Sequence, residues 1–152
     1  VFVAGFQWIE DCLRKHDLIS EDPYEIIGDA SLSPQHNGMN RSRIVRQSVF
    51  ENYSYAIAVE CSIGCQQGMF TREELEQLVR LSGAKLIQDS NQTIESELTI
   101  IVLCDDDDKL VIKKYQHFKN PVFYVIPEFF LDSLVLYEVQ PIKGYELLYQ
   151  ID

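Results

Sequence analysis

The chain has 152 residues, which is room for one domain of ordinary size with a remainder, or for two very small domains. Apolar residues make up 46% of the chain and charged residues 24%, a composition that indicates a folded globular protein and excludes a disordered tail. No apolar run approaches the roughly 18 uninterrupted residues of a membrane-spanning helix. The net charge of −11 disfavours sequence-independent binding to a nucleic-acid backbone, because like charges repel.

The start of the chain and its cysteines indicate the cellular compartment of the protein. No basic segment precedes Trp8 and Glu10, so a secretory signal is not expected. There is no initiator Met, and we expect the chain to be a fragment of a longer polypeptide. Four cysteines are too few for a disulfide framework of this length, which favours a reducing intracellular compartment. They are Cys12, Cys61, Cys65 and Cys104.

Residues 1–26 and residues 122–147 align without a gap at a constant offset of 121. Each segment is predicted to form a short strand, a helix with a bulky aromatic residue on its inner face, and a short extended piece. The second copy closes one complete unit, so the first is expected to be the end of an earlier unit. Its strand and helix then need the upstream part of that unit, or a partner, to cover them. The aligned pairs include Asp11 with Asp132, Tyr24 with Tyr145, and Trp8 with Phe129.

A helix is predicted over residues 6–16, where Phe6, Ile9 and Leu13 fall on one stripe at helical spacing. The composition then changes to Gly, Ser, Pro and Asn between residues 27 and 47, which indicates a linker.

The linker holds the only concentrated positive charge before the second unit. It is carried by Arg41, Arg43 and Arg46. One hypothesis is that these arginines contact a phosphate or an acidic partner. The alternative is a solvated linker that turns into a short helix.

The second unit is predicted to run strand, helix, strand, strand, helix, strand, helix. Thr71 and Glu74 form a capping-box pattern at the start of its first helix. The run 98–104 is apolar at both odd-numbered and even-numbered positions, as expected of a strand buried on both faces of a parallel sheet. The fold class is therefore α/β, with a small parallel four-stranded sheet flanked by helices. The strands are expected at 53–60, 85–88, 98–104 and 122–126, and the helices at 71–82, 109–117 and 128–138.

No pattern of residues predicts catalysis. Cys61 and Cys65 could begin a metal site, but the three histidines show no paired ligand spacing. The acidic run 105–108 lacks the spaced ligands and the glycine of a calcium loop, and is read as a solvated loop that caps the next helix. The sequence therefore predicts no enzyme, metal, cofactor or small-molecule substrate.

Three stretches of the chain resemble a tandem BRCT repeat. Residues 6–13, with the signature Trp8, and residues 24–26 resemble the family's final helix and the segment after it. Residues 75–84 resemble its first helix and the small-residue turn that follows, and residues 132–137 resemble the last helix of a second repeat.

The resemblance implies a BRCT fold with a definite partition. Residues 1–26 would be the C-terminal part of a first repeat, residues 27–50 the inter-repeat linker, and residues 51–152 the second repeat. It also implies a nuclear protein of DNA-damage signalling that recognises phosphoserine peptides. The family holds the phosphate in its first repeat, so the phosphate pocket is expected upstream of Val1.

The resemblance further assigns residues of the second repeat to an apolar pocket that receives an aromatic residue of the phosphopeptide. These are Phe70 and Leu131, with Met69 beside them; Phe70 stands where the family has Met. Their alternative role is packing between the repeats. Trp8 and Phe129 are interpreted as core residues, because an aromatic ring on the inner stripe of a helix buries a large area.

Two further hypotheses stand beside the phosphopeptide reading. The linker arginines could contact a nucleosome or DNA. The second repeat could also be purely structural and brace the first.

Overall fold

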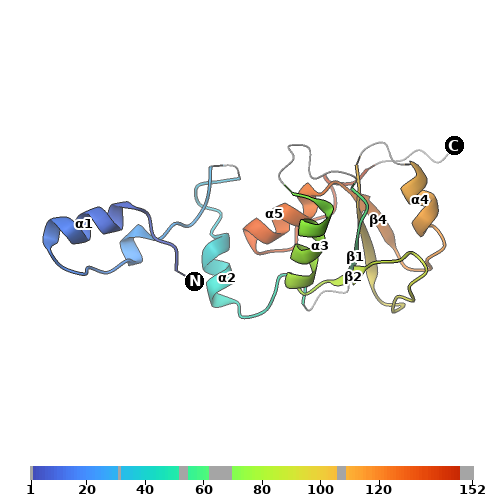
Figure 1. Cartoon of the computed structure of the whole chain (residues 1–152), viewed down its shortest axis with the longest axis horizontal. Helices are drawn as coiled ribbons and strands as arrows, with labels where there is room; N and C mark the ends of the chain where they lie inside the picture. Colours follow the sequence, from blue (N-terminus) through green and yellow to red (C-terminus); the bar gives the residue numbers. More distant parts are fainter. Residues whose placement is uncertain (1, 31, 52–54, 62–69, 106–108, 148–152) are drawn as a thin grey trace. The chain divides into compact units, whose positions relative to one another are not determined.

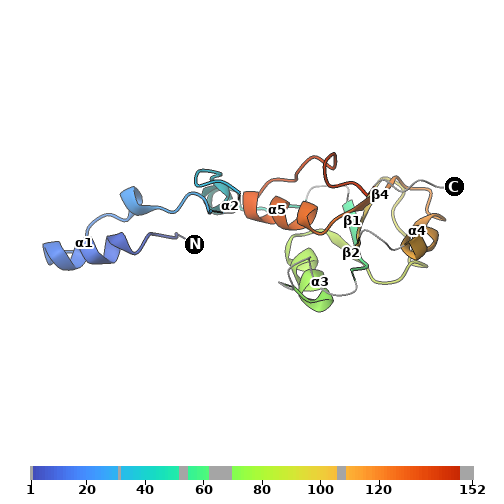
Figure 2. The same ribbon diagram turned by 90° about the horizontal axis from the view of Figure 1, so that it is seen from above.

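The computed structural model describes residues 2–30, 32–51, 55–61, 70–105 and 109–147. The chain forms two compact units, drawn in Figures 1 and 2. Unit 1 comprises Val1–Arg46 with Val135–Glu138, and unit 2 comprises Gln47–Leu134 with Val139–Asp152.

Unit 2 is built on one parallel sheet of four strands in the order β2-β1-β3-β4. Helices α3 and α5 cover one face of this sheet and α4 covers the other (Figures 1 and 2). This arrangement confirms the predicted fold class, and all seven predicted elements are present with slightly shorter ends. The strands are β1 (Tyr55–Val59), β2 (Lys85–Ile87), β3 (Thr99–Leu103) and β4 (Val122–Val125), and the helices are α3 (Arg72–Leu81), α4 (Lys109–Tyr115) and α5 (Glu128–Leu136).

Strand β3 is the centre of the core, as its doubly apolar sequence predicts. Its last four residues have no exposed surface, because β1 and β4 flank the strand and helices cover both faces of the sheet. The two buried aromatic residues of α5 pack against other aromatic rings of unit 2. Phe130 stacks on Phe50 with ring centroids 5.6 Å apart, and Phe129 meets Tyr145 edge-on at 5.8 Å.

Helix α3 begins and ends as its sequence predicts. The Thr71 hydroxyl accepts a hydrogen bond from the Glu74 amide at 3.3 Å, and the Thr71 amide donates to Glu74 Oε2 at 2.7 Å. Past the end of the helix, Gly83 has φ +84°, and a β-carbon there would lie 2.8 Å from Glu51 Cα. Only glycine fits this turn.

Unit 1 contains helix α1 (Gln7–Lys15), a short 3-10 helix, Asp22–Tyr24, and helix α2 (Gly38–Ile44). Helix α1 has the predicted amphipathic stripe, yet none of its residues is buried. Helix α2 is the short helix considered for the linker, and it packs with residues 135–138 at the end of α5.

Candidate functional site

The two segments that align in sequence also share a side-chain hydrogen bond. The Tyr24 hydroxyl donates to Asp11 Oδ2 at 2.7 Å in unit 1. The Tyr145 hydroxyl donates to Asp132 Oδ2 at 2.8 Å in unit 2. Both pairs span 13 residues and differ in position by 121, so the same tyrosine returns to the same helix position in each copy.

The backbone of the two segments repeats in the same way. Each helix ends at a residue in the left-handed region, with φ 53° at His16 and 51° at Tyr137. Each segment before its helix is bridged to the extended piece after it by antiparallel hydrogen bonds. In unit 1 these run from Gly5 to Tyr24 (2.8 Å) and from Ile26 to Val3 (2.9 Å), and in unit 2 from Ile126 to Tyr145 (3.0 Å) and from Leu147 to Tyr124 (2.9 Å).

The pKa of the tyrosine is raised in both of the shared pairs. The hydrogen bond to Asp11 raises the pKa of Tyr24, and the same bond lowers the pKa of Asp11. Burial and the hydrogen bond to Asp132 raise the pKa of Tyr145 to about 12. Both tyrosines therefore stay protonated and act as donors at neutral pH.

The aromatic residues proposed for the core differ between the copies. Phe129 has no exposed surface in unit 2. Trp8 is half-buried in unit 1, where its indole N–H donates to the carbonyl of Ile19 at 3.0 Å. The difference arises because α5 lies on a sheet, whereas no strand of the part of the chain that the structure describes covers α1.

Of the predicted pocket residues, Phe70 and Leu131 belong to unit 2 and adjoin or lie on α3 and α5, the two helices that cover the same face of the sheet (Figures 1 and 2). Phe70 directly precedes the capped start of α3, and Leu131 lies on α5 one turn after Pro127. Both side chains are half-buried, which leaves part of each apolar surface available to a ligand. Met69 lies outside the described residues.

Two of the three linker arginines have partners within unit 1. Arg41 Nε donates to the Leu136 carbonyl at 2.8 Å, and its Nη2 donates to the same oxygen. Arg43 pairs with Glu25 at 3.0 Å and lies 4.9 Å above the Phe2 ring. Arg46 is exposed. The contacts of Arg41 and Arg43 were not predicted from the sequence, because no local pattern relates either arginine to its partner.

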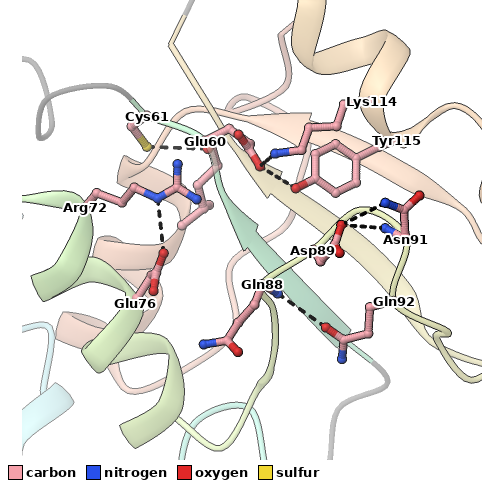
Figure 3. A network of polar contacts seen from close by, with 11 residues as sticks. Glu60, Cys61, Arg72, Glu76, Gln88, Asp89, Asn91, Gln92, Lys114 and Tyr115 are labelled. Atoms are coloured by element: carbon pink, nitrogen blue, oxygen red, sulfur yellow. Dashed lines mark hydrogen bonds and ion pairs between the residues drawn. The ribbon is translucent and has the colours of Figure 1, made fainter.

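A polar network that was not predicted from the sequence lies at the carboxyl end of β1 (Figure 3). Glu60 follows this strand and accepts hydrogen bonds from Lys114 Nζ at 2.6 Å and from the Tyr115 hydroxyl at 2.5 Å. Burial and the bond to Glu60 raise the pKa of Tyr115. Arg72 pairs with Glu76 beside it at 3.1 Å. The Glu60 carboxylate is thus already bound by a cation and a hydroxyl group.

Other chemistry has no geometric support in the described residues. Those residues contain no cluster of three or more His, Cys, Asp or Glu that could hold a metal ion. Cys61 and Cys104 are buried thiols that form no disulfide among the described residues, while Cys65 and residues 106–108 lie outside the described part of the chain. None of the described helices is long and apolar enough to cross a membrane.

The chain is similar to a curated protein and to several solved structures. No protein-family model matches the chain. The breast cancer type 1 susceptibility protein homolog of Rattus norvegicus is 25% identical over 91 residues, which cover 58% of this chain and 4% of that protein.

Three solved structures are also similar to the chain. The C-terminal BRCT domain of human XRCC1 is 13% identical with a TM-score of 0.46, and 68% of this chain covers 97% of that domain. The second XRCC1 BRCT domain is 12% identical with a TM-score of 0.48, the coverages being 69% and 96%. The BRCT domain of the human DNA repair protein REV1 is 21% identical with a TM-score of 0.43, the coverages being 68% and 91%.

Proposed function

We propose that this chain, which has the BRCT fold and resembles the breast cancer type 1 susceptibility protein, is a nuclear protein-interaction module of the DNA-damage response. Residues 1–26 form the C-terminal part of one repeat, residues 27–50 the linker, and residues 51–152 the second repeat. With the upstream repeat in place, the module recognises phosphoserine peptides. This chain contributes no enzymatic step.

One observation supports this organisation above the others: the Tyr–Asp pair and its backbone frame occur twice at one offset. Two copies of one supersecondary unit are expected of a tandem repeat. Phe70 and Leu131 then supply the apolar surface for an aromatic residue of the peptide. Their position supports this role, because both are half-buried beside helices on one side of the sheet.

The experiment compares the 152-residue chain with the natural polypeptide extended upstream by one repeat. Isothermal titration with a phosphoserine peptide and its unphosphorylated form should show phosphate-dependent binding only for the longer protein. Phe70→Ala and Leu131→Ala in the longer protein should weaken binding about 10-fold to 100-fold, as expected for the loss of an apolar anchor.

A matched control for these variants is Leu81→Ala, because Leu81 lies at the end of α3 and is 76% exposed. This variant should bind as the parent does. Equal binding by all three variants would favour a purely structural second repeat. Phosphate-dependent binding by the 152-residue chain alone would contradict the upstream location of the phosphate pocket.

A second candidate function is a nucleosome or DNA contact through the linker, and the exposure of Arg46 favours it. Arg46→Ala should then reduce the slope of log K against log salt by roughly one, as expected for the loss of one phosphate contact. Because Arg41 and Arg43 are already engaged, their alanine variants should instead lower the stability of unit 1. An unchanged slope for Arg46→Ala would exclude its phosphate contact.

A further inference from the structure

Helix α2 begins at an Asn–Gly dipeptide, and the backbone favours each of the two residues. Asn37 has φ 62°, in the left-handed region that asparagine adopts more readily than most other residues with a side chain. Gly38 is buried, and a β-carbon there would lie 2.0 Å from the Val135 carbonyl oxygen. The sequence Asn–Gly occurs nowhere else in the chain.

This dipeptide is also chemically reactive. The backbone nitrogen of Gly38 can attack Cγ of the Asn37 side chain, because glycine has no β-carbon to hinder the approach. A C–N bond forms, the Gly38 nitrogen loses its proton, and the side-chain amide takes up that proton and leaves as ammonia. Water then opens the cyclic imide at one of its two carbonyls, and the product is aspartate or isoaspartate.

The folded backbone prevents this attack. Asn37 has ψ 17°, which in an L-residue places the Gly38 nitrogen and Asn37 Cβ on opposite sides of the Cα–C bond. The imide ring needs both atoms on the same side, so the backbone must rotate about this bond before the ring can close. The Asn37 side chain makes no capping hydrogen bond to α2, so its amide is not held in place by that helix.

Two hydrogen bonds hold the Asn37–Gly38 peptide group against the rotation. Its oxygen accepts from the Arg41 amide at 3.0 Å, and its nitrogen donates to His36 Nδ1 at 3.0 Å. The His36 side chain is 4% exposed, and its Nε2 lies 3.2 Å from Asp29 Oδ2. Because Nδ1 accepts a hydrogen bond, Nε2 carries the hydrogen and donates it to Asp29. His36 is therefore itself held in place while it holds the Gly38 amide.

We propose that Asn37 is a deamidation site that reacts only when the first turn of helix α2 is released. Rotation about the Cα–C bond breaks both hydrogen bonds of the peptide group, so the imide forms from a locally open state. Isoaspartate adds a carbon to the main chain at residue 37, and Gly38 then cannot regain its place against Val135. Deamidation thus turns a transient release of α2 into a permanent one.

Peptide mapping by mass spectrometry tests the site after the 152-residue chain has been incubated at physiological pH and temperature. Methylation by an isoaspartyl methyltransferase identifies the isoaspartate independently. A synthetic peptide of residues 33–42 shows the reaction without the fold. We expect the folded chain to deamidate at least about 10-fold more slowly than the peptide. Equal rates would overturn the role of α2, and an unreactive peptide would overturn the site.

Two variants test the restraint on the peptide group. His36→Ala should raise the rate in the folded chain about 3-fold to 10-fold, because the Gly38 amide loses its acceptor. His117→Ala, at an exposed histidine of unit 2, is the matched control and should leave the rate unchanged. Arg41→Ala should also raise the rate, because it removes the bonds from α2 to the Leu136 carbonyl, whereas Arg46→Ala at an exposed position should not.

The synthetic peptide and hydrogen exchange complete the test. His36→Ala in the peptide should not change its rate, which shows that the effect in the chain arises from the fold. A slower reaction of His36→Ala in the chain would overturn the proposal, since His36 would then assist the reaction. The Arg41 amide should exchange faster in the purified isoaspartate form than in the parent, because its acceptor has moved. Unchanged exchange would overturn the permanent release of α2.

Discussion

A β-carbon on Gly38 would lie 2.0 Å from the carbonyl oxygen of Val135, so helix α2 meets the last turn of α5 backbone against backbone. Arg41, one turn further along α2, completes this contact by donating two hydrogen bonds to the Leu136 carbonyl. The carbonyls at the end of a helix have no partners within it, so an arginine is a suitable group to satisfy them. Close packing and a charged cap together hold the linker helix in unit 1.

Replacing Gly38 with Ala should displace α2 from this contact. Atoms this close to an added methyl group must move, and overpacking of this kind costs about 1–3 kcal/mol. Thermal unfolding of unit 1, followed by Trp8 fluorescence, measures the loss. Gly5→Ala is the control, because its nearest neighbour is the Tyr24 carbonyl at an ordinary 3.6 Å. A similar effect of both substitutions would contradict the packing argument.

The repeated tyrosine gives a second prediction. Tyr145→Phe removes the donor to Asp132 and should lower the free energy of unfolding of unit 2 by about 1–2 kcal/mol, as expected for a hydrogen bond to a charged group. Urea denaturation measures the change. Combined with Asp132→Asn, the loss should be smaller than the sum of the single losses, because both variants break one interaction. Strict additivity would show that the two side chains do not act as a pair.

Alkaline pH should lower the free energy of unfolding of unit 2. Folding raises the pKa of Tyr145 from its ordinary value of 10.0 to about 12, and it also raises the pKa of Tyr115. The folded state therefore keeps these protons when the unfolded state has lost them. The stabilisation is fully present below pH 10 and is lost as the pH rises towards 12.

Urea midpoints measured between pH 8 and pH 12 check this dependence. Tyr145→Phe should make the curve flatter above pH 10, and the double variant with Tyr115→Phe should make it flatter still. Tyr137→Phe is the control, because Tyr137 belongs to unit 1 and not to unit 2. If the urea midpoint of the double variant falls with pH as steeply as that of the parent, other groups cause the loss of stability at alkaline pH.

The sequence predicted what local patterns determine. The doubly apolar run of β3 and the capping box at Thr71 depend on neighbours along the chain, and both are confirmed. The contacts of Arg41 with Leu136 and of Glu60 with Tyr115 span 95 and 55 residues, so no local pattern encodes them. The repeat is the exception, because alignment of the chain with itself relates distant segments.

The bulky aromatics at equivalent positions should differ in what they contribute to stability. Phe129→Ala should cost about 3–5 kcal/mol in unit 2, since a fully buried ring is replaced by a cavity. A small domain has about 5–15 kcal/mol in all, so its melting temperature should fall by many degrees. Trp8→Ala should cost less in the 152-residue chain, where the ring is half-buried, and should approach the cost of Phe129→Ala in a longer protein whose upstream part covers α1. Calorimetry of both variants in both proteins checks the comparison. A melting temperature of Phe129→Ala within a degree or two of the parent would contradict its core role, and a cost of Trp8→Ala that upstream residues do not increase would show that they leave α1 uncovered.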